Sequence, residues 1–305
     1  MLKTIFLGTP GLAVLFLERL YQKTKVEAVI TAPDQPAGRG YALKSPEVKI
    51  AAQKLSLPVL QPETLKNPTM VDQIRAFSAD VGIVVAYGKL LPKEVLSIPK
   101  HGFLNVHFSL LPKYRGAAPI QWALINGETE TGVTLFWLDE GMDTGPILLQ
   151  KKVPILPEDN ADSLRNNLVE IGVICLEVAL GMIELGKIAG EPQAGAASKA
   201  AILKKEDGQI DWNKPAEAIW NQMRGMTPWP GTYSGHLKIL KAHPRLESGA
   251  GQSGVVIRVV SGEGPVVKCG KDALALLQVQ PEGKKQMSAW NWWQGARLKI
   301  GDKIG

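Results

Sequence analysis

The sequence predicts an α/β protein with a doubly wound parallel sheet in its first half and a small all-β barrel near its end. Two observations lead to this fold class. In the first half, short apolar runs alternate with helical patterns, which is the order of strands and crossover helices in a parallel sheet. Over roughly the last 80 residues, short β-like runs are separated by glycine-containing turns, which is typical of a small barrel.

The apolar runs of the first half are expected to be strands, and the stretches between them are expected to be helices. The strand runs are Thr4–Leu7, Val26–Ile30, Val81–Ala86, Phe103–Val106 and Thr131–Trp137. The helical stretches are Leu12–Tyr21, Val48–Leu55, Val71–Phe77 and Pro119–Ile125. The residues from Ile83 to Ala86 are all apolar, which fits a strand covered on both faces. Because ligands bind such sheets at the carboxyl ends of the strands, we expect a site in the loops that follow these runs.

The second half divides into a predicted linker and a predicted β-rich domain. The linker, residues 189–208, is rich in Ala, Lys and Gly, and it separates a first domain of residues 1–188 from a last domain of residues 209–305. A short helix is expected at Ala216–Met223. The β-like runs that follow are Leu237–Leu240, Gly254–Val260, Pro265–Lys268 and Ala273–Val279.

Composition argues against several classes of protein. The chain of 305 residues is 45% hydrophobic, which suffices for about two domains with cores of their own. Its longest apolar region, Leu168–Leu185, is interrupted by acidic residues, and no stretch reaches the roughly 20 apolar residues of a membrane helix. Cys175 and Cys269 lie far apart in apolar runs, and the four histidines lack metal-ligand spacing. We therefore expect a cytoplasmic protein with no disulfide framework, no metal and no membrane segment.

The net charge of +6 is unevenly distributed along the chain. Residues 1–190 carry 19 basic and 19 acidic side chains, whereas residues 191–305 carry 16 basic and 10 acidic ones. The whole positive excess therefore lies in the last third. Such asymmetry is consistent either with ordinary surface charge or with a polyanionic partner for that part of the chain.

A polar pair lies at the end of the strand predicted at Phe103–Val106. Asn105 and His107 are two residues apart, so in an extended chain their side chains project to the same face. An amide and an imidazole that share a pocket supply a hydrogen-bond donor for an oxyanion and a proton acceptor. The pair is also consistent with polar side chains that are merely satisfied at a strand end.

A glycine-punctuated polar loop, residues 138–146, follows the strand predicted at Thr131–Trp137. A carboxylate from this loop can orient His107 and stabilise its protonated form, as the acid of a catalytic triad does. Asp and Gly are also common in turns for purely local reasons. The loop contains both Asp139 and Asp143, and the residues alone do not choose between them.

The loop after the strand predicted at Val26–Ile30 is rich in proline and glycine. It contains Gly38, Arg39 and Gly40. Backbone N–H groups and an arginine suit phosphate contacts, and an ordinary surface loop has the same composition.

Near the start of the chain, residues 8–11 depart from the Gly-x-Gly-x-x-Gly fingerprint of dinucleotide-binding proteins, which argues against a nicotinamide-dependent oxidoreductase.

Taken together, these features resemble the methionyl-tRNA formyltransferase family. The matching blocks of the first part are Phe6–Pro10, Pro36–Gly40, Val84–Gly88, Asn105–His107, Ser109–Pro112, Arg115–Gln121, Glu130–Thr134 and Asp143–Gly145. Those of the last third are Ile210–Trp212, Pro228–Pro230 and Gly283–Met287. The blocks around Asn105 and Asp143 are shared with all folate-dependent formyltransferases, whereas the blocks of the last third resemble the tRNA enzyme.

The resemblance implies a Rossmann-like first domain that binds 10-formyltetrahydrofolate and an OB-like last domain that helps to hold tRNA. It implies transfer of the formyl group to the amino group of initiator methionyl-tRNA, and we expect a monomer. The implied catalytic residues are Asn105, His107 and Asp143. The implied folate contacts are Val85, Ala86 and Tyr87 together with Ser109, Leu110, Leu111 and Pro112. The loop of Gly38, Arg39 and Gly40 is implied to contact the acceptor end of the tRNA.

The chain departs from the family's pattern at a few positions. Phe108 stands where a small residue is usual, and we expect altered packing because its side chain points away from the face of Asn105 and His107. Gly11 stands where an acid is frequent, and Tyr41-Ala42 replace two basic residues.

The nearest alternative function is formyl transfer to a sugar or nucleotide amine, which does not require the positive charge of the last third. A non-catalytic tRNA-binding protein would be free to lose the three implied catalytic residues.

Overall fold

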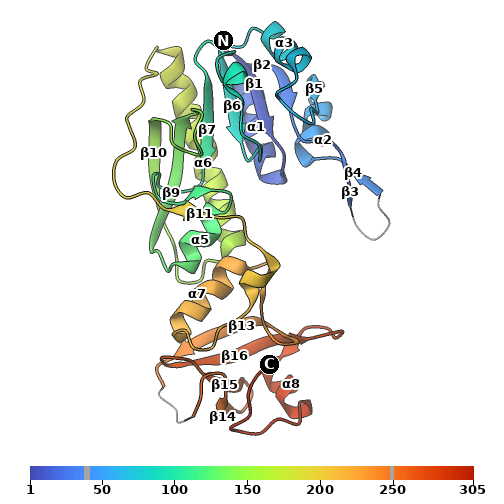
Figure 1. The fold of residues 1–305 in the computed structure, drawn as a ribbon, viewed down its shortest axis with the longest axis vertical. Coiled ribbons are helices and arrows are strands. Elements are labelled where there is room, and N and C mark those ends of the chain that lie inside the picture. Colours follow the sequence, from blue (N-terminus) through green and yellow to red (C-terminus); the bar gives the residue numbers. More distant parts are fainter. Residues whose placement is uncertain (38–41, 248–250) are drawn as a thin grey trace. The chain divides into compact units, whose positions relative to one another are not determined.

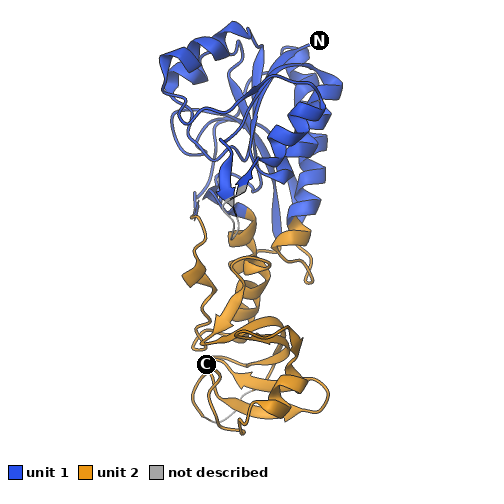
Figure 2. Ribbon diagram, turned by 90° about the vertical axis from the view of Figure 1, so that its right-hand side faces the viewer, with its two compact units in different colours: residues 1–119, 130–154, 165–200 blue, residues 120–129, 155–164, 201–305 orange. Residues whose placement is uncertain are grey.

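The computed structural model describes residues 1–37, 42–247 and 251–305, with the elements labelled in Figure 1. The chain divides into two compact units, which Figure 2 distinguishes by colour. Unit 1 contains residues 1–119, 130–154 and 165–200. Unit 2 contains residues 120–129, 155–164 and 201–305.

Unit 1 is built on a seven-stranded sheet with the order β10-β9-β7-β6-β1-β2-β5. The strands are β1 (Lys3–Gly8), β2 (Lys25–Ile30), β5 (Val59–Leu60), β6 (Val81–Val85), β7 (Phe103–His107), β9 (Glu130–Trp137) and β10 (Ile147–Pro154). The strands from β5 to β7 pair in parallel, whereas β9 is antiparallel to both β7 and β10. The doubly wound parallel sheet is confirmed, and it carries an antiparallel edge that the sequence did not reveal.

Helices connect and cover these strands (Figure 1). They are α1 (Val14–Lys23), α2 (Glu47–Lys54), α3 (Pro68–Ala76) and α4 (Lys93–Leu96), with the 3-10 turn η1 (Gly11–Ala13) before α1. The helices α5 (Pro119–Ile125) and α6 (Ala161–Glu184) each include residues of both units. Two short strand pairs complete unit 1, namely β3 (Gln35–Ala37) with β4 (Ala42–Lys44) and β8 (Arg115–Gly116) with β11 (Lys199–Ala200).

Within the described ranges, α6 is the helix that is long and apolar enough, by length and composition, to cross a membrane. In the structure, 44% of its most apolar window is buried. Leu168, Leu176 and Ala179 are fully buried, and Arg19 of α1 forms an ion pair with Glu177. These are the contacts of a helix that packs on a protein core, and core helices often have this composition.

Close packing fixes the two strands that lead to the site. All five residues of β6 are buried. A Cβ at Gly82 would lie 2.2 Å from the Phe103 ring of β7, so only glycine fits there. The strand order places the switch point of the sheet between β1 and β6. The carboxyl ends of β6 and β7 are therefore rigid and lie where a ligand site is expected.

Unit 2 is built on an antiparallel sheet of six strands. The order β12-β13-β16-β15-β14 runs through β12 (Thr232–Ser234), β13 (Leu237–Arg245), β16 (Ala273–Pro281), β15 (Gly264–Lys268) and β14 (Val256–Val260), and β17 (Met287–Ser288) pairs with β16. The unit also contains the turn η2 (Lys205–Gly208) and the helices α7 (Ala216–Met226) and α8 (Ala289–Gly295). This architecture confirms the barrel-like β domain that the sequence predicts.

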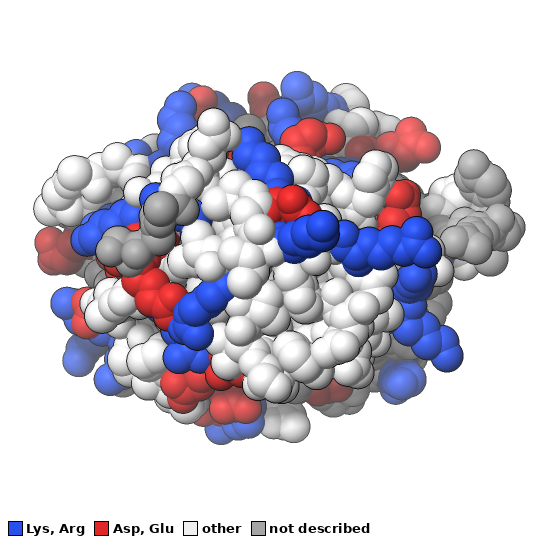
Figure 3. Space-filling model, turned by 90° about the horizontal axis from the view of Figure 1, so that it is seen from below, with Lys and Arg blue, Asp and Glu red and all other residues white. Residues whose placement is uncertain are grey.

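Figure 3 shows the face that Figure 1 draws at the bottom, in the region of β14, β15 and α8. A broad uncharged area occupies its centre. Basic side chains form a row along one side of this area, and acidic side chains lie beside them. The positive excess of the last third is therefore not a uniform basic patch on this face.

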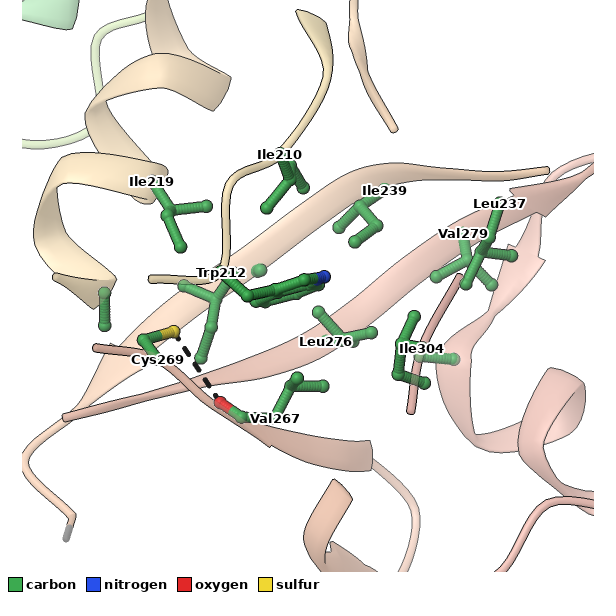
Figure 4. Close-up of a cluster of buried hydrophobic side chains, with 14 of the residues drawn as sticks. Ile210, Trp212, Ile219, Leu237, Ile239, Val267, Cys269, Leu276, Val279 and Ile304 are labelled. Carbon is green, nitrogen blue, oxygen red and sulfur yellow. Dashed lines mark hydrogen bonds between the residues drawn. The ribbon is translucent and has the colours of Figure 1, made fainter. Parts of the chain in front are cut away.

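The core of unit 2 is a cluster of buried apolar side chains around Trp212 (Figure 4). The indole N–H of Trp212 donates to Ser234 Oγ at 2.9 Å, and that hydroxyl donates to the Ile304 carbonyl at 2.8 Å. Cys269 belongs to the same cluster and donates to the Val267 carbonyl at 3.7 Å. Burial raises the pKa of Cys269 to about 12, so the thiol stays protonated and packs as an apolar group.

Residues 189–208, which the sequence predicts as a linker, are shared between the two units. The part up to Ala200 belongs to unit 1, where β11 pairs in parallel with β8. The part from Ala201 onward belongs to unit 2 and includes η2. The first part of this stretch is thus built into the fold of unit 1, close in space to residues that follow β7.

Candidate active site

A pocket of about 420 Å³ opens in unit 1 at the carboxyl ends of β6 and β7. Its charged and polar lining residues are Lys89, Asn105, His107, Asp139 and Asp143. Its apolar and aromatic lining residues include Val84, Ala86, Tyr87, Leu90, Leu91, Leu96, Phe108, Leu138 and Met142. A mostly apolar wall with a few convergent polar groups is typical of a site for a small organic molecule.

Strand β7 presents Asn105 and His107 to this pocket, as their spacing predicts. Asn105 is paired in register with Val84 on β6 and with Phe136 on β9, so its backbone is held on both sides. His107 ends the strand with 6% of its surface exposed, and its ring packs edge-on against Phe136. The sheet therefore fixes the position of both side chains.

The hydrogen bonds of His107 determine where its proton lies. Its Nε2 is 2.9 Å from the backbone carbonyl oxygen of Tyr114. Since a carbonyl oxygen only accepts, Nε2 carries the proton and donates it. In the neutral ring, Nδ1 therefore has a free lone pair, and it lies 3.7 Å from Asp143 Oδ2.

Burial also keeps the His107 ring neutral. It lowers the pKa of His107 below its ordinary value, while the Asp143 carboxylate and the hydrogen bond to Tyr114 act in the opposite direction. Burial thus favours the uncharged ring. A proton taken up at Nδ1 would produce an imidazolium that faces the Asp143 carboxylate, and an opposite charge at this distance stabilises the charged ring.

The structure distinguishes the two aspartates of the polar loop. Asp139 Oδ1 accepts from the Gly141 N–H at 3.0 Å and from the Thr144 hydroxyl at 2.7 Å, so it stabilises its own turn. Asp143 Oδ2 accepts from the Gly116 N–H at 2.7 Å and faces His107. Asp143 also has a φ of +54°, a conformation that residues other than glycine seldom adopt. Asp143 is therefore the carboxylate that can stabilise a protonated His107.

The residues predicted as folate contacts after β6 have different positions. Ala86 and Tyr87 line the pocket, whereas Val85 is a fully buried residue of β6 and is not among the described lining residues. Burial raises the pKa of Tyr87 to about 12, so its phenol is uncharged. Leu90 and Met142 also line the pocket and are exposed, and no sequence pattern indicated them. Exposed apolar side chains in polar loops were the signal that could have found them.

The segment Ser109–Pro112 forms a buried turn after His107 and is not among the described residues that line the pocket. The Ser109 hydroxyl donates to the Lys113 carbonyl at 2.6 Å, and the Thr134 hydroxyl donates to the Ser109 carbonyl at 2.6 Å. These bonds hold the backbone that follows His107. The contact of Ser109, Leu110, Leu111 and Pro112 with folate stays a prediction.

Gly38, Arg39 and Gly40 lie outside the described residues. The strands β3 and β4 on either side of them form an antiparallel pair. Before β3, Asp34 accepts from Lys49 Nζ at 2.6 Å, and this partner lowers the pKa of the Asp34 carboxyl. The segment just before β3 is therefore held to α2 by this ion pair.

Phe108 directly follows β7, and its ring packs against helices α1 and α6. Its ring lies edge-on to Phe16 of α1, with centroids 6.2 Å apart. Gly172 of α6 lies against both rings, since a Cβ there would be 2.8 Å from Phe16 and 3.6 Å from Phe108. The large side chain therefore fills space between the sheet and two helices.

The arrangement as a whole is suited to acyl transfer. An amide donor, a neutral imidazole and a carboxylate meet at one wall of the pocket, where they can stabilise an oxyanion and move a proton. In the part of the chain that the structure describes, no group of three or more His, Cys, Asp or Glu side chains is placed to hold a metal ion.

Known proteins resemble the chain over its whole length. A family profile described as "Formyl transferase" matches residues 3–180, and one described as "Formyl transferase, C-terminal domain" matches residues 202–297. The methionyl-tRNA formyltransferase of Geobacter sulfurreducens is 42% identical over 308 residues, which cover all of this chain and 97% of the relative. That of Thermodesulfovibrio yellowstonii is 45% identical over 302 residues, or 97% of each chain.

A solved structure has a similar fold. It is an N-formyltransferase from Helicobacter canadensis in complex with folinic acid and dTDP-3-aminofucose. The two chains align with a TM-score of 0.66 at 22% identity, over 90% of this chain and 99% of the other. At this identity the likeness concerns the fold alone.

Proposed function

The chain belongs to the methionyl-tRNA formyltransferase family, and on this premise we propose how its residues carry out the reaction. The enzyme transfers the formyl group of 10-formyltetrahydrofolate to the free amino group of initiator methionyl-tRNA. The product is N-formylmethionyl-tRNA for translation initiation. The observation that carries the proposed mechanism is the position of His107 at the pocket wall, where its Nε2 is held by the Tyr114 carbonyl and its Nδ1 lies 3.7 Å from Asp143 Oδ2.

The reaction begins when the acceptor amine attacks the formyl carbon. A model α-amine has a pKa of about 7.7–8.0, and esterification of the amino acid lowers it, so much of the amine is neutral at pH 7. Positioning and stabilisation of the tetrahedral oxyanion are then the main tasks of the enzyme. We assign the oxyanion contact to the Asn105 side-chain amide, which donates from the end of β7.

His107 transfers the proton between the two nitrogens. It takes the proton of the attacking amine at Nδ1, and Asp143 stabilises the resulting imidazolium. It then returns this proton to N10 of the folate as the bond between the formyl carbon and N10 breaks. One C–N bond forms, one breaks, and no oxidant or metal is needed.

The donor is proposed to occupy the pocket of unit 1. The volume of about 420 Å³ lies within the range of small-molecule sites, and the wall is apolar around Leu90, Leu91 and Met142. Ala86 and Tyr87 are the wall residues that we propose to contact the pterin. We also propose that Val85 and the turn Ser109–Pro112 belong to the folate site, where the hydrogen bonds of Ser109 hold the backbone of the turn.

Unit 2 is proposed to supply most of the electrostatic affinity for tRNA. The positive excess of the chain lies in residues 191–305. On β13, Lys238 and Lys241 are exposed while Ile239 and Ala242 are buried, and the irregular pairing between Ile239 and Ala242 brings both lysines to solvent although they are three residues apart. Phosphate contacts of this kind release counterions and give salt-dependent affinity.

The proposed division of labour follows the predicted domains. Residues 1–188 carry catalysis and folate binding, residues 189–208 connect, and residues 209–305 bind tRNA. The loop of Gly38, Arg39 and Gly40 adds a contact near the acceptor end. We further propose that the enzyme acts in the cytoplasm as a monomer.

A sugar or nucleotide amine is not favoured as the acceptor. The full-length relatives at 42% and 45% identity are methionyl-tRNA formyltransferases, whereas the enzyme solved with dTDP-3-aminofucose is 22% identical.

To test the function, the protein is incubated with 10-formyltetrahydrofolate and initiator tRNA that carries labelled methionine. Labelled formylmethionine is expected after deacylation. Formylation of a dTDP-linked amino sugar without formylation of the tRNA would overturn the proposal.

A further inference from the structure

The residues just before and within β11 support the backbone around His107. Ser198 Oγ accepts from the Tyr114 N–H at 2.8 Å, and the Ser198 carbonyl accepts from the Arg115 N–H at 2.9 Å. Tyr114 supplies the carbonyl that accepts from His107. This stretch lies far from β7 in sequence, yet it holds the hydrogen-bond acceptor of the catalytic imidazole.

Gln193, in the same stretch, reaches the loop of Asp143 directly. Its Nε2 donates to the Asp143 carbonyl and to the Gly145 carbonyl, both at 2.9 Å. Its Oε1 accepts from Arg115 Nε at 3.2 Å and from Arg115 Nη2 at 2.7 Å. Because a guanidinium only donates, Arg115 determines which way the amide points and turns its NH₂ group toward the two carbonyls.

We propose that Gln193 is a positioning residue that holds the Asp143 carboxylate in place beside His107. The inference rests on the proposed function, in which His107 is the base. Gln193 touches no reacting atom and acts through Asp143. Its two donated bonds anchor the backbone on both sides of Thr144. Asp143 needs such anchoring because a φ of +54° is maintained by its surroundings and not by its own preference.

A positioning role and a purely structural role lead to different kinetics. If Gln193 positions Asp143, its loss lowers kcat, because the imidazolium is less well stabilised during proton transfer, and the KM for each substrate changes little. If Gln193 only stabilises the fold, its loss lowers the unfolding temperature and leaves kcat of the folded enzyme unchanged. If it belongs to a substrate site, KM rises instead.

The test compares two substitutions of Gln193 with a control in the full-length chain. Gln193→Met keeps the length of the side chain and removes every hydrogen bond. Gln193→Glu keeps the acceptor for Arg115 and turns a carboxylate toward two carbonyl oxygens. Gln53→Met is the matched control, since Gln53 is an exposed residue of α2. Initial rates are measured with methionyl-tRNA and with 10-formyltetrahydrofolate varied in turn.

The expected result is a fall in kcat of about tenfold to a hundredfold for Gln193→Met, with both KM values within about twofold of wild type. Gln193→Glu is expected to be no better than Gln193→Met, and Gln53→Met is expected to match wild type. A wild-type kcat in either Gln193 variant, or a change in KM alone, would overturn the inference. Loss of folding in both variants would also contradict it, because a half-buried positioning residue is not needed for the fold. Lack of activity in the wild-type protein would instead count against the proposed function.

Discussion

Unit 1 and unit 2 bury polar groups in different ways. In unit 1, buried polar side chains gather near the site, including His107, Ser109 and Thr134, beside an Asp143 in an unfavourable backbone conformation. In unit 2, Trp212 lies in an apolar cluster and its indole N–H donates to Ser234, while other buried polar side chains of the unit include Asn221, Gln222 and Thr232. Unit 1 thus holds polar groups in fixed places beside a pocket, whereas the Trp212 cluster of unit 2 is held together by apolar burial.

The largest expected effect tests whether the apolar cluster around Trp212 stabilises unit 2. Trp212→Ala removes the central side chain of the unit 2 core, and we expect a loss of about 3–5 kcal/mol in the free energy of unfolding. Urea unfolding followed by circular dichroism measures it. Trp229→Ala is the matched control in the same unit, because Trp229 is 58% exposed and should change stability by less than about 1 kcal/mol. Equal effects of the two substitutions would mean that the cluster around Trp212 is not the stabilising core.

The second largest expected effect tests the role of the polar side chains that line the pocket of unit 1. Asn105→Ala, His107→Ala and Asp143→Ala should each lower turnover, by about 10²–10³ where an oxyanion or proton-transfer contact is lost. All three side chains line one pocket, and the fold should persist in each variant. Steady-state kinetics with folded protein measures turnover. Near-normal turnover of the His107 variant would remove it from the mechanism.

These residues also show how far the sequence could predict the site. Asn105 and His107 could be predicted from the sequence because residues two apart in a strand share a face, and β7 has that geometry. The local pattern could not choose Asp143 over Asp139, which only the family resemblance indicated, because the choice depends on the Gly116 N–H, 27 positions away in sequence. Local composition is nearly the same for both aspartates.

The parts of the fold that were missed have a similar origin. The strand β10 escaped prediction because Gln150, Lys151 and Lys152 are exposed at its middle, as suits the edge of a sheet. The role of Gln193 could not be predicted from the sequence, because its hydrogen-bond partners, the carbonyls of Asp143 and Gly145, are 50 and 48 positions away. Periodicity reports burial along one element and carries no information on contacts between distant segments.

A smaller effect is expected at the loop of Arg39. This residue is the only base between Thr31 and Leu43 in the sequence. A charge-assisted hydrogen bond contributes about 1.5–3 kcal/mol, so Arg39→Ala should impair the use of tRNA by roughly tenfold to a hundredfold. Folate dependence should barely change, because the folate contacts are assigned to other segments. Kinetics with each substrate varied in turn decide the point, and a defect confined to folate would mean that the loop serves the other ligand.

The smallest expected effect concerns the stability of unit 1 as pH falls. Burial lowers the pKa of His107 in the folded chain below the ordinary histidine value of about 6.5. Between the folded pKa and about 6.5, the unfolded chain holds a proton on this residue that the folded chain lacks. Its contribution to stability is therefore fully present above pH 6.5 and is lost as the pH falls toward the folded pKa, with a slope of up to about 1.4 kcal/mol per pH unit.

The contribution of His107 to the pH dependence of stability should disappear in one variant and persist in another. His107→Gln removes the titrating group, so the urea midpoint of this variant should fall less than that of wild type between about pH 7 and pH 5. His243→Gln is the matched control in unit 2, because His243 is exposed on β13, and it should keep the wild-type slope. The comparison uses slopes, so a constant change in stability from either substitution does not matter. A wild-type slope in His107→Gln would mean that His107 titrates alike in the folded and unfolded chains. Unit 1 would then not hold a neutral imidazole by burial, and the proposed proton uptake at Nδ1 would lose its physical basis.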